Sequence, residues 1–195
     1  MMPILSTARL ARTLAKNTIA AALALPALLP GSAYADKPPR PPNVPAAIQV
    51  PAGNRPFLLG HATGTQNYTC QATSTGYAWT FVAPAATLVH GKGNQTITHF
   101  AGPTWQAHDG SAVVAAGVAG VPVTPGAIPW LLLRATSTMP GPDGGDRLTA
   151  TTYIQRVNTT GGLAPTSGCD ATTVGAAANV PYTSDYYFYK SVELE

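Results

Sequence analysis

Charged residues are scarce in this sequence of 195 residues: they make up 10% of it, against 45% hydrophobic residues. Of the 11 Lys and Arg residues, three precede position 36, and the remainder balance the eight Asp and Glu residues, all of which lie from position 36 onward. Binding to nucleic acid or to an anionic membrane requires an excess of positive charge. The charge balance therefore predicts no nucleic-acid partner and gives no support to an anionic-membrane partner.

Motifs for nucleotide chemistry and for serine nucleophiles are also missing. The chain contains no G-x-G-x-x-G after a predicted strand, no G-x-x-x-x-G-K-S/T and no G-x-S-x-G. The first two motifs arrange backbone N–H groups around phosphates, and the third presents a serine on a sharp turn. Dinucleotide, P-loop and serine-elbow chemistry are therefore unsupported, and we expect no cofactor.

Metal-ligand spacing is absent as well. The four histidines are His61, His90, His99 and His108, and paired strands could bring several of them together around a metal. No H-x-H or H-x-x-x-H pair occurs, however, so we expect ordinary histidines rather than a metal site.

No hydrophobic run approaches the roughly 20 residues that a membrane-spanning helix needs. An apolar run of about 12 residues at 18–29 follows three basic residues and precedes Ala33-Tyr34-Ala35. A positive start, a short apolar centre and small residues at the end are typical of a secretory signal peptide. We expect a signal peptide at 1–35 that is cleaved after Ala35, no transmembrane segment, and a secreted or periplasmic protein.

The chain has only two cysteines, Cys70 and Cys169. A structural zinc site needs four ligands, so two cysteines do not supply one. In an exported protein the favoured interpretation is a disulfide between them, and the alternative is a pair of free buried thiols.

Glycine and proline are abundant, with 19 of each, which excludes long helices because proline removes a backbone donor and glycine costs entropy. Seven prolines fall within 36–56, which predicts an extended Pro-rich arm outside the core, followed by a β domain at 57–195. Turn residues then recur between short apolar or alternating segments. We predict an all-β fold, either a single-domain β-sandwich or a closed β-barrel, of about eight or nine short strands. The expected strands are 57–62, 66–72, 77–83, 86–90, 96–100, 111–118, 128–138, 148–159 and 183–190.

Four side chains are the candidate ligand-binding residues: His99, Trp105, Asp109 and Arg156. Trp105 stands in a loop-like segment, where an aromatic ring can either stack on a sugar or flat ligand or plug the end of the fold. Arg156 and Gln155 point to opposite faces of one strand, and an inward Arg156 would need a partner such as Asp109 or Asp170. That pairing would be either an anion site or a structural salt bridge.

Three functions stay open at this point. The leading hypothesis is a non-enzymatic binding or envelope-associated module with a small-molecule or carbohydrate ligand. The alternative is a hydrolase-like or metal-dependent enzyme that uses His99, His108 and Asp109. The third is a purely structural surface protein held by its disulfide.

Several phrases of the sequence resemble a bacterial and fungal family of secreted proteins of unknown function. They are GTQNYTC at 64–70, AGPTW at 101–105, DGS at 109–111, IPWLLL at 128–133, YIQRVNT at 153–159 and VPYTSDYYFY at 180–189. The likeness covers about 44–189 and supplies no catalytic residues. Some fungal members carry a malate dehydrogenase label, which the missing dinucleotide motif does not support here. The acidic residues that the family usually has in its Pro-x-Ala segment and near the following glycine are replaced by Pro84-Ala85-Ala86 and His90.

Overall fold

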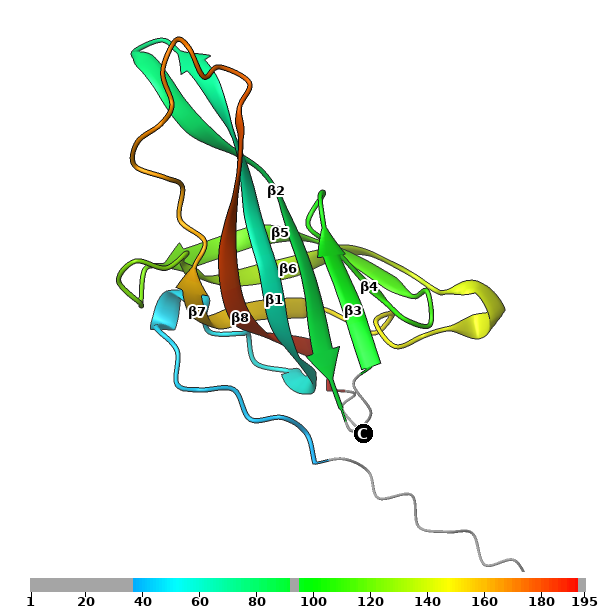
Figure 1. Ribbon diagram of the computed structural model, residues 1–195. Coiled ribbons are helices and arrows are strands. Elements are labelled where there is room, and N and C mark those ends of the chain that lie inside the picture. Colours follow the sequence, from blue (N-terminus) through cyan, green and yellow to red (C-terminus); the bar gives the residue numbers. More distant parts are fainter. Residues whose placement is uncertain (1–36, 92–94, 193–195) are drawn as a thin grey trace, which may run out of the picture. The chain divides into compact units, whose positions relative to one another are not determined.

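The computed structural model describes residues 37–91 and 95–192. The predicted signal peptide at 1–35 lies outside the described residues, as do residues 36, 92–94 and 193–195. The described residues form eight antiparallel strands, each paired with the next along the chain, and the last strand pairs with the first to close a barrel (Figure 1). The predicted all-β fold is confirmed, and of the two predicted alternatives the structure is the closed β-barrel.

The strands are β1 (Asn54–Thr73), β2 (Gly76–His90), β3 (Gln95–Phe100), β4 (Thr104–Ala107), β5 (Ala112–Val121), β6 (Trp130–Met139), β7 (Tyr153–Gly161) and β8 (Ala177–Ser191). Two short 3-10 helices, η1 (Ala46–Ile48) and η2 (Pro142–Gly144), lie outside the sheet. No helix in the described part of the chain is long and apolar enough to cross a membrane.

Two of these strands are much longer than expected. β1 replaces the predicted strands at 57–62 and 66–72, and β2 replaces those at 77–83 and 86–90. Gly64, which lies between the two predicted strands, pairs with Ala86 inside the sheet, and a Cβ on Gly64 would come within 2.5 Å of the Ala86 Cα. The glycine therefore permits a close approach between β1 and β2 instead of ending the strand.

β8 contributes side chains to two hydrophobic clusters, one inside the barrel and one on its outer face. Tyr186 and Phe188 of β8 point into the barrel, where they join the interior core with Trp105 of β4. Tyr187 and Tyr189 point outward and are also buried. Since successive side chains of a strand alternate between faces, both faces of β8 must be covered.

The cover on the outer face is the Pro-rich segment. Ile48 of η1 is fully buried against Val157 and Tyr187, and the Gln155 side chain donates a hydrogen bond to the Ile48 carbonyl over 2.7 Å. This differs from the expectation that 36–56 stays outside the core, and β1 also begins at Asn54 rather than at 57. Apolar residues between the prolines are numerous enough to bind the arm to the sheet.

β1 and β2 continue beyond the barrel as a two-stranded hairpin (Figure 1). The predicted disulfide between Cys70 and Cys169 is present, with a Cα–Cα distance of 5.3 Å. Cys70 lies on the hairpin and Cys169 lies in the segment between β7 and β8. The Trp79 indole N–H also donates to the Ser167 carbonyl over 2.8 Å, and the backbone of Cys70 exchanges hydrogen bonds with Gly175 and Ala176, so hydrogen bonds as well as the disulfide hold this segment to the hairpin.

Candidate ligand-binding pocket

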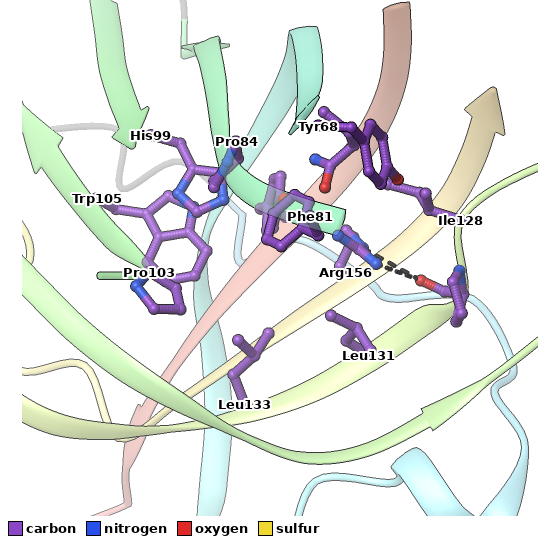
Figure 2. A pocket seen from close by; sticks show the side chains of 13 residues that line it. Tyr68, Phe81, Pro84, His99, Pro103, Trp105, Ile128, Leu131, Leu133 and Arg156 are labelled. Atoms are coloured by element: carbon purple, nitrogen blue, oxygen red, sulfur yellow. Dashed lines mark hydrogen bonds between the residues drawn. The ribbon is translucent and has the colours of Figure 1, made fainter. Parts of the chain in front are cut away.

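A pocket of about 270 Å³ lies at the base of this hairpin (Figure 2). Its walls come from β1, β2, β3, β4, β6, β7 and β8 and from the turns beside them. The lining residues are Gln66, Tyr68, Phe81, Pro84, His99, Pro103, Trp105, Ile128, Pro129, Leu131, Leu133, Arg156 and Tyr186. Three of the four side chains expected at a ligand site, His99, Trp105 and Arg156, therefore line one pocket.

His99 and Trp105 form the aromatic side of the pocket. They are directly opposite each other on β3 and β4, and their rings stack with centroids 4.1 Å apart at an angle of 7°. The edge of Tyr186 packs against both rings, at centroid distances of 5.4 and 5.5 Å. Trp105 is 1% exposed and His99 is 4% exposed, so this packing fixes both rings and leaves only a small part of their surface open to the pocket.

His99 is held in one protonation state by this packing. Burial lowers the pKa of His99 to about 4, a hydrogen bond to the Thr104 carbonyl partly opposes that effect, and the charge of Arg156 adds to it. His99 is therefore neutral at pH 7. Because Nδ1 lies 2.9 Å from a carbonyl, which can only accept, Nδ1 carries the proton and Nε2 has a free lone pair.

Arg156 brings a positive charge into the pocket. It follows Ile154 on the inward face of β7, it is 8% exposed, and its Nε and Nη2 donate to the Pro129 carbonyl over 3.1 and 2.8 Å. The expected pairing with Asp109 or Asp170 is wrong. Among the described residues the single ion pair joins His61 to Asp185, so no described carboxylate neutralises Arg156.

Two lining residues, Gln66 and Trp105, have side-chain nitrogens that are enclosed by the protein and have no hydrogen-bond partner among the described residues. Tyr68 is satisfied, because its hydroxyl donates to the Gly162 carbonyl over 2.7 Å. Gln66 and Tyr68 were not expected at the site, although their alternation with Asn67 already indicated that they share one face of a strand.

Asp109, the fourth expected residue, does not line this pocket. Its Oδ1 accepts hydrogen bonds from the Ser111 hydroxyl and N–H over 2.6 and 3.0 Å, and its Oδ2 accepts from the Arg147 N–H over 3.0 Å. Burial raises the pKa of Asp109, but these hydrogen bonds outweigh it and lower the pKa to about 2. The Ser111 hydroxyl in turn accepts from the N–H of fully buried Leu148 over 3.1 Å. The segment 109–111 thus joins the β4–β5 turn to the segment that follows η2.

The side chains of the enzyme alternative do not assemble. His99 pairs with Trp105, whereas Asp109 follows the opposite end of β4, four residues farther along the chain. Between Trp105 and Asp109 lie Gln106 and Ala107 of β4 and the turn residue His108, and no hydrogen bond among the described residues joins His99 to His108 or Asp109. His108 lies beside Asp109, because its backbone N–H donates to the Thr96 carbonyl at that same end.

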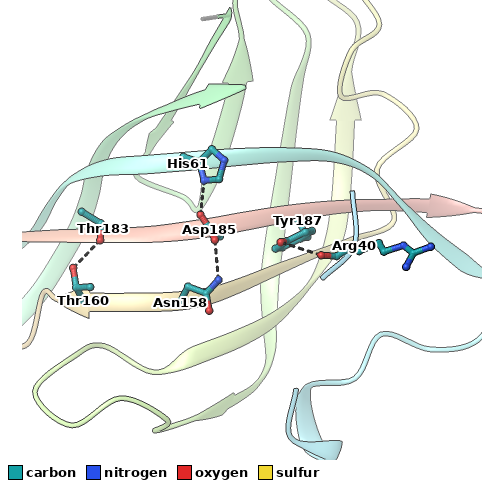
Figure 3. A network of polar contacts seen from close by, with 7 residues as sticks. All are labelled: Arg40, His61, Asn158, Thr160, Thr183, Asp185 and Tyr187. Carbon is teal, nitrogen blue, oxygen red and sulfur yellow. Dashed lines mark hydrogen bonds and ion pairs between the residues drawn. The ribbon is translucent and has the colours of Figure 1, made fainter. Parts of the chain in front are cut away.

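His61 and His90 also lie away from the pocket. His61 is on the outer surface, where its Nδ1 lies 2.6 Å from an oxygen of Asp185, whose other oxygen accepts from Asn158 (Figure 3). Burial lowers the pKa of His90, with smaller effects from Arg147 and His108. Within residues 37–91 and 95–192, no three His, Cys, Asp or Glu side chains gather so that they could hold a metal ion.

Comparison with known proteins identifies the family of the chain but no activity and no ligand. No curated protein matches the chain, and neither does any solved structure. The family model described as "Protein of unknown function (DUF3455)" matches residues 51–190, which contain all the barrel strands except the end of β8. The chain belongs to this DUF3455 family.

Proposed function

We propose that this protein is an exported, non-enzymatic binding module whose pocket takes one small ligand. The observation that carries the proposal is the combination of apolar walls with one buried charge that has no described counter-charge. Buried charges in folded proteins are normally paired. The described partner of the Arg156 guanidinium is the neutral Pro129 carbonyl.

The surrounding frame supports a preformed site. The pocket walls belong to strands paired around a closed sheet, so binding requires little ordering of the backbone. The mouth of a β-barrel is a common position for ligand sites, which usually enclose roughly 300–1,000 Å³. A volume of about 270 Å³ favours a small molecule or a single sugar ring over a lipid or a peptide.

Export is supported by the signal-like pattern at 1–35 and by a disulfide, which persists in oxidising compartments. We expect the mature protein to begin at Asp36. Intact-mass analysis of protein recovered from the periplasm or the medium tests this. An uncleaved, reduced chain that stays in the cytoplasm would contradict it.

The binding function is tested by thermal shift with a panel of small sugars, small carboxylic acids and short-chain lipids. We expect at least one class to raise the melting temperature of the wild-type chain. Leu131→Trp fills the pocket and should abolish the shift, whereas Val118→Trp, on the exposed face of β5, should retain it. No shift with any compound, or equal shifts in the two variants, would contradict the proposal.

A further inference from the structure

We infer that the ligand of this pocket is a small organic acid with one carboxylate and a flat apolar body, and that Arg156 receives the carboxylate. This inference rests on the binding function proposed above and adds the chemical class of the ligand.

The first argument is charge. A guanidinium keeps its proton at physiological pH, so the pocket contains a permanent positive charge. Buried charges in proteins are normally paired, because desolvation without a partner is costly. The Pro129 carbonyl supplies a dipole but no charge, and His99 is neutral. A ligand with a single negative charge would neutralise Arg156.

The second argument is the geometry of the guanidinium. Its Nε and Nη2 already face the Pro129 carbonyl on one side. Nη1 has no hydrogen-bond acceptor among the described residues and is not fully buried. The free edge formed by Nη1 and the second N–H of Nη2 presents two parallel donors, which is the arrangement that a planar carboxylate accepts in a bidentate manner.

The third argument is the uneven distribution of groups around the pocket. In Figure 2 the two sides are occupied by different groups: His99, Trp105 and Pro103 on one, and Arg156, Tyr68 and Ile128 on the other, with Leu131 and Leu133 below. A molecule with its anionic group at Arg156 would therefore extend its other end towards Pro103, the edges of His99 and Trp105, and the two leucines. That side of the pocket supplies mostly apolar contacts, which suit an apolar body.

The same features argue against phosphate esters and sugars as ligands. A phosphate monoester carries up to two charges and three terminal oxygens, and Arg156 is the only permanently charged side chain that lines the pocket. A sugar needs polar partners on several sides, whereas leucine, proline, isoleucine and aromatic residues form most of the lining. One anionic group attached to an apolar body fits both the single charge and the apolar remainder.

The test compares acids with their uncharged amides on the unaltered mature chain. Benzoate, phenylacetate and cinnamate are titrated at pH 7 against benzamide, phenylacetamide and cinnamamide by calorimetry or ligand-observed NMR, with phenyl phosphate as a further probe. We expect the acids to bind roughly 10- to 100-fold more tightly than the amides, because charge-assisted hydrogen bonds are lost with the amide. Phenyl phosphate should bind more weakly than benzoate.

Variants assign the effect to Arg156. Arg156→Gln should remove the preference for acids and leave amide binding largely unchanged. Arg134→Gln, at an exposed position of β6, is the matched control and should retain the preference. If Arg156→Gln does not fold, the comparison of acids with amides on the wild-type chain still decides the ligand class.

The possible outcomes separate the two proposals. Amides that bind as tightly as acids, or phenyl phosphate that binds more tightly than benzoate, would overturn the carboxylate inference and leave the binding function in place. An acid preference that survives in Arg156→Gln would overturn the role of Arg156. If neither the acids nor the amides bind, and no compound of the thermal-shift panel raises the melting temperature, the binding function itself is overturned.

Discussion

At the Asp109 end of β4, the hydroxyl of Ser111 both donates and accepts a hydrogen bond, and the carboxylate of Asp109 accepts three. Near Trp105, at the other end of the same strand, Arg156 has no described counter-charge and Gln66 has an unpartnered amide nitrogen. Both places hold polar groups against the apolar interior. In the first the protein supplies the partners itself, and in the second the charge of Arg156 has no described counterpart.

The difference shows how a structural polar cluster can be distinguished from a candidate binding site. Residue types do not separate them, because an aspartate beside a serine and an arginine beside a histidine are both typical of functional sites. What separates them is whether each buried donor and acceptor is already satisfied. The following predictions test this distinction, from the largest expected effect to the smallest.

Removing the disulfide should have the largest effect. In Cys70→Ser/Cys169→Ser the free energy of unfolding should fall by about 4 kcal/mol, because the bond closes a long loop in the unfolded chain. Denaturant unfolding measures the loss, and hydrogen exchange should locate increased opening at the hairpin beside the pocket rather than at the segment 109–111. A uniform increase in exchange across the barrel would contradict the expected location.

Acidification should have the second largest effect, a fall in the free energy of unfolding caused by His99 in the pocket wall. Unfolded His99 takes up a proton near pH 6.5, whereas the folded side chain does so only at about 4. Between these values the unfolded state binds more protons, so the stabilisation is complete above pH 6.5 and declines as pH falls to about 4. The loss is on the order of 3 kcal/mol. Urea unfolding at stepped pH measures it.

The control for the acid effect is His99→Phe, which keeps a ring against Trp105 but does not titrate. Its stability should vary less with pH between 4 and 6.5 than that of the wild-type chain. Equal slopes in the two proteins would show that another group causes the acid sensitivity.

Asp109→Ala should lower the free energy of unfolding by about 2 kcal/mol, because N–H and hydroxyl donors that are now paired would lose a charged acceptor. Asp146→Ala removes an aspartate side chain with no described hydrogen bond and serves as the comparison in urea unfolding. Binding of the acids should be unaffected in Asp109→Ala. A loss of acid binding as large as that of Arg156→Gln would indicate that Asp109 does belong to the binding site.

Arg156→Met should have the smallest effect on stability, within about 1 kcal/mol of wild type or slightly stabilising, because it replaces a buried unneutralised charge by an apolar side chain. The same variant should lose the preference for acids. Urea unfolding and the acid–amide titration measure the two effects. Destabilisation as large as that of Asp109→Ala would indicate that Arg156 is chiefly structural.

Much of the candidate site could be predicted from the sequence. Trp105 was identified because a large aromatic ring stood beside a turn, and Arg156 because an inward-facing charge on a strand would need a partner. Asp109 was included because it lay close in sequence to the histidines, yet β4 separates it from His99. Phe81 and Gln66 were not expected at the site, because alternation along a strand does not show which face lines a pocket.

The abundance of turn residues between short apolar or alternating segments predicted an all-strand fold, and two cysteines in a chain with a signal-like start favoured a disulfide over free thiols. Alternation along β7 also showed that Gln155 and Arg156 point in opposite directions. It could not show which of them points inward, because both faces of the strand are covered. The closed sheet encloses Arg156, and the segment around Ile48 covers Gln155 from outside. That choice depends on contacts between residues about 100 positions apart, which no local pattern encodes.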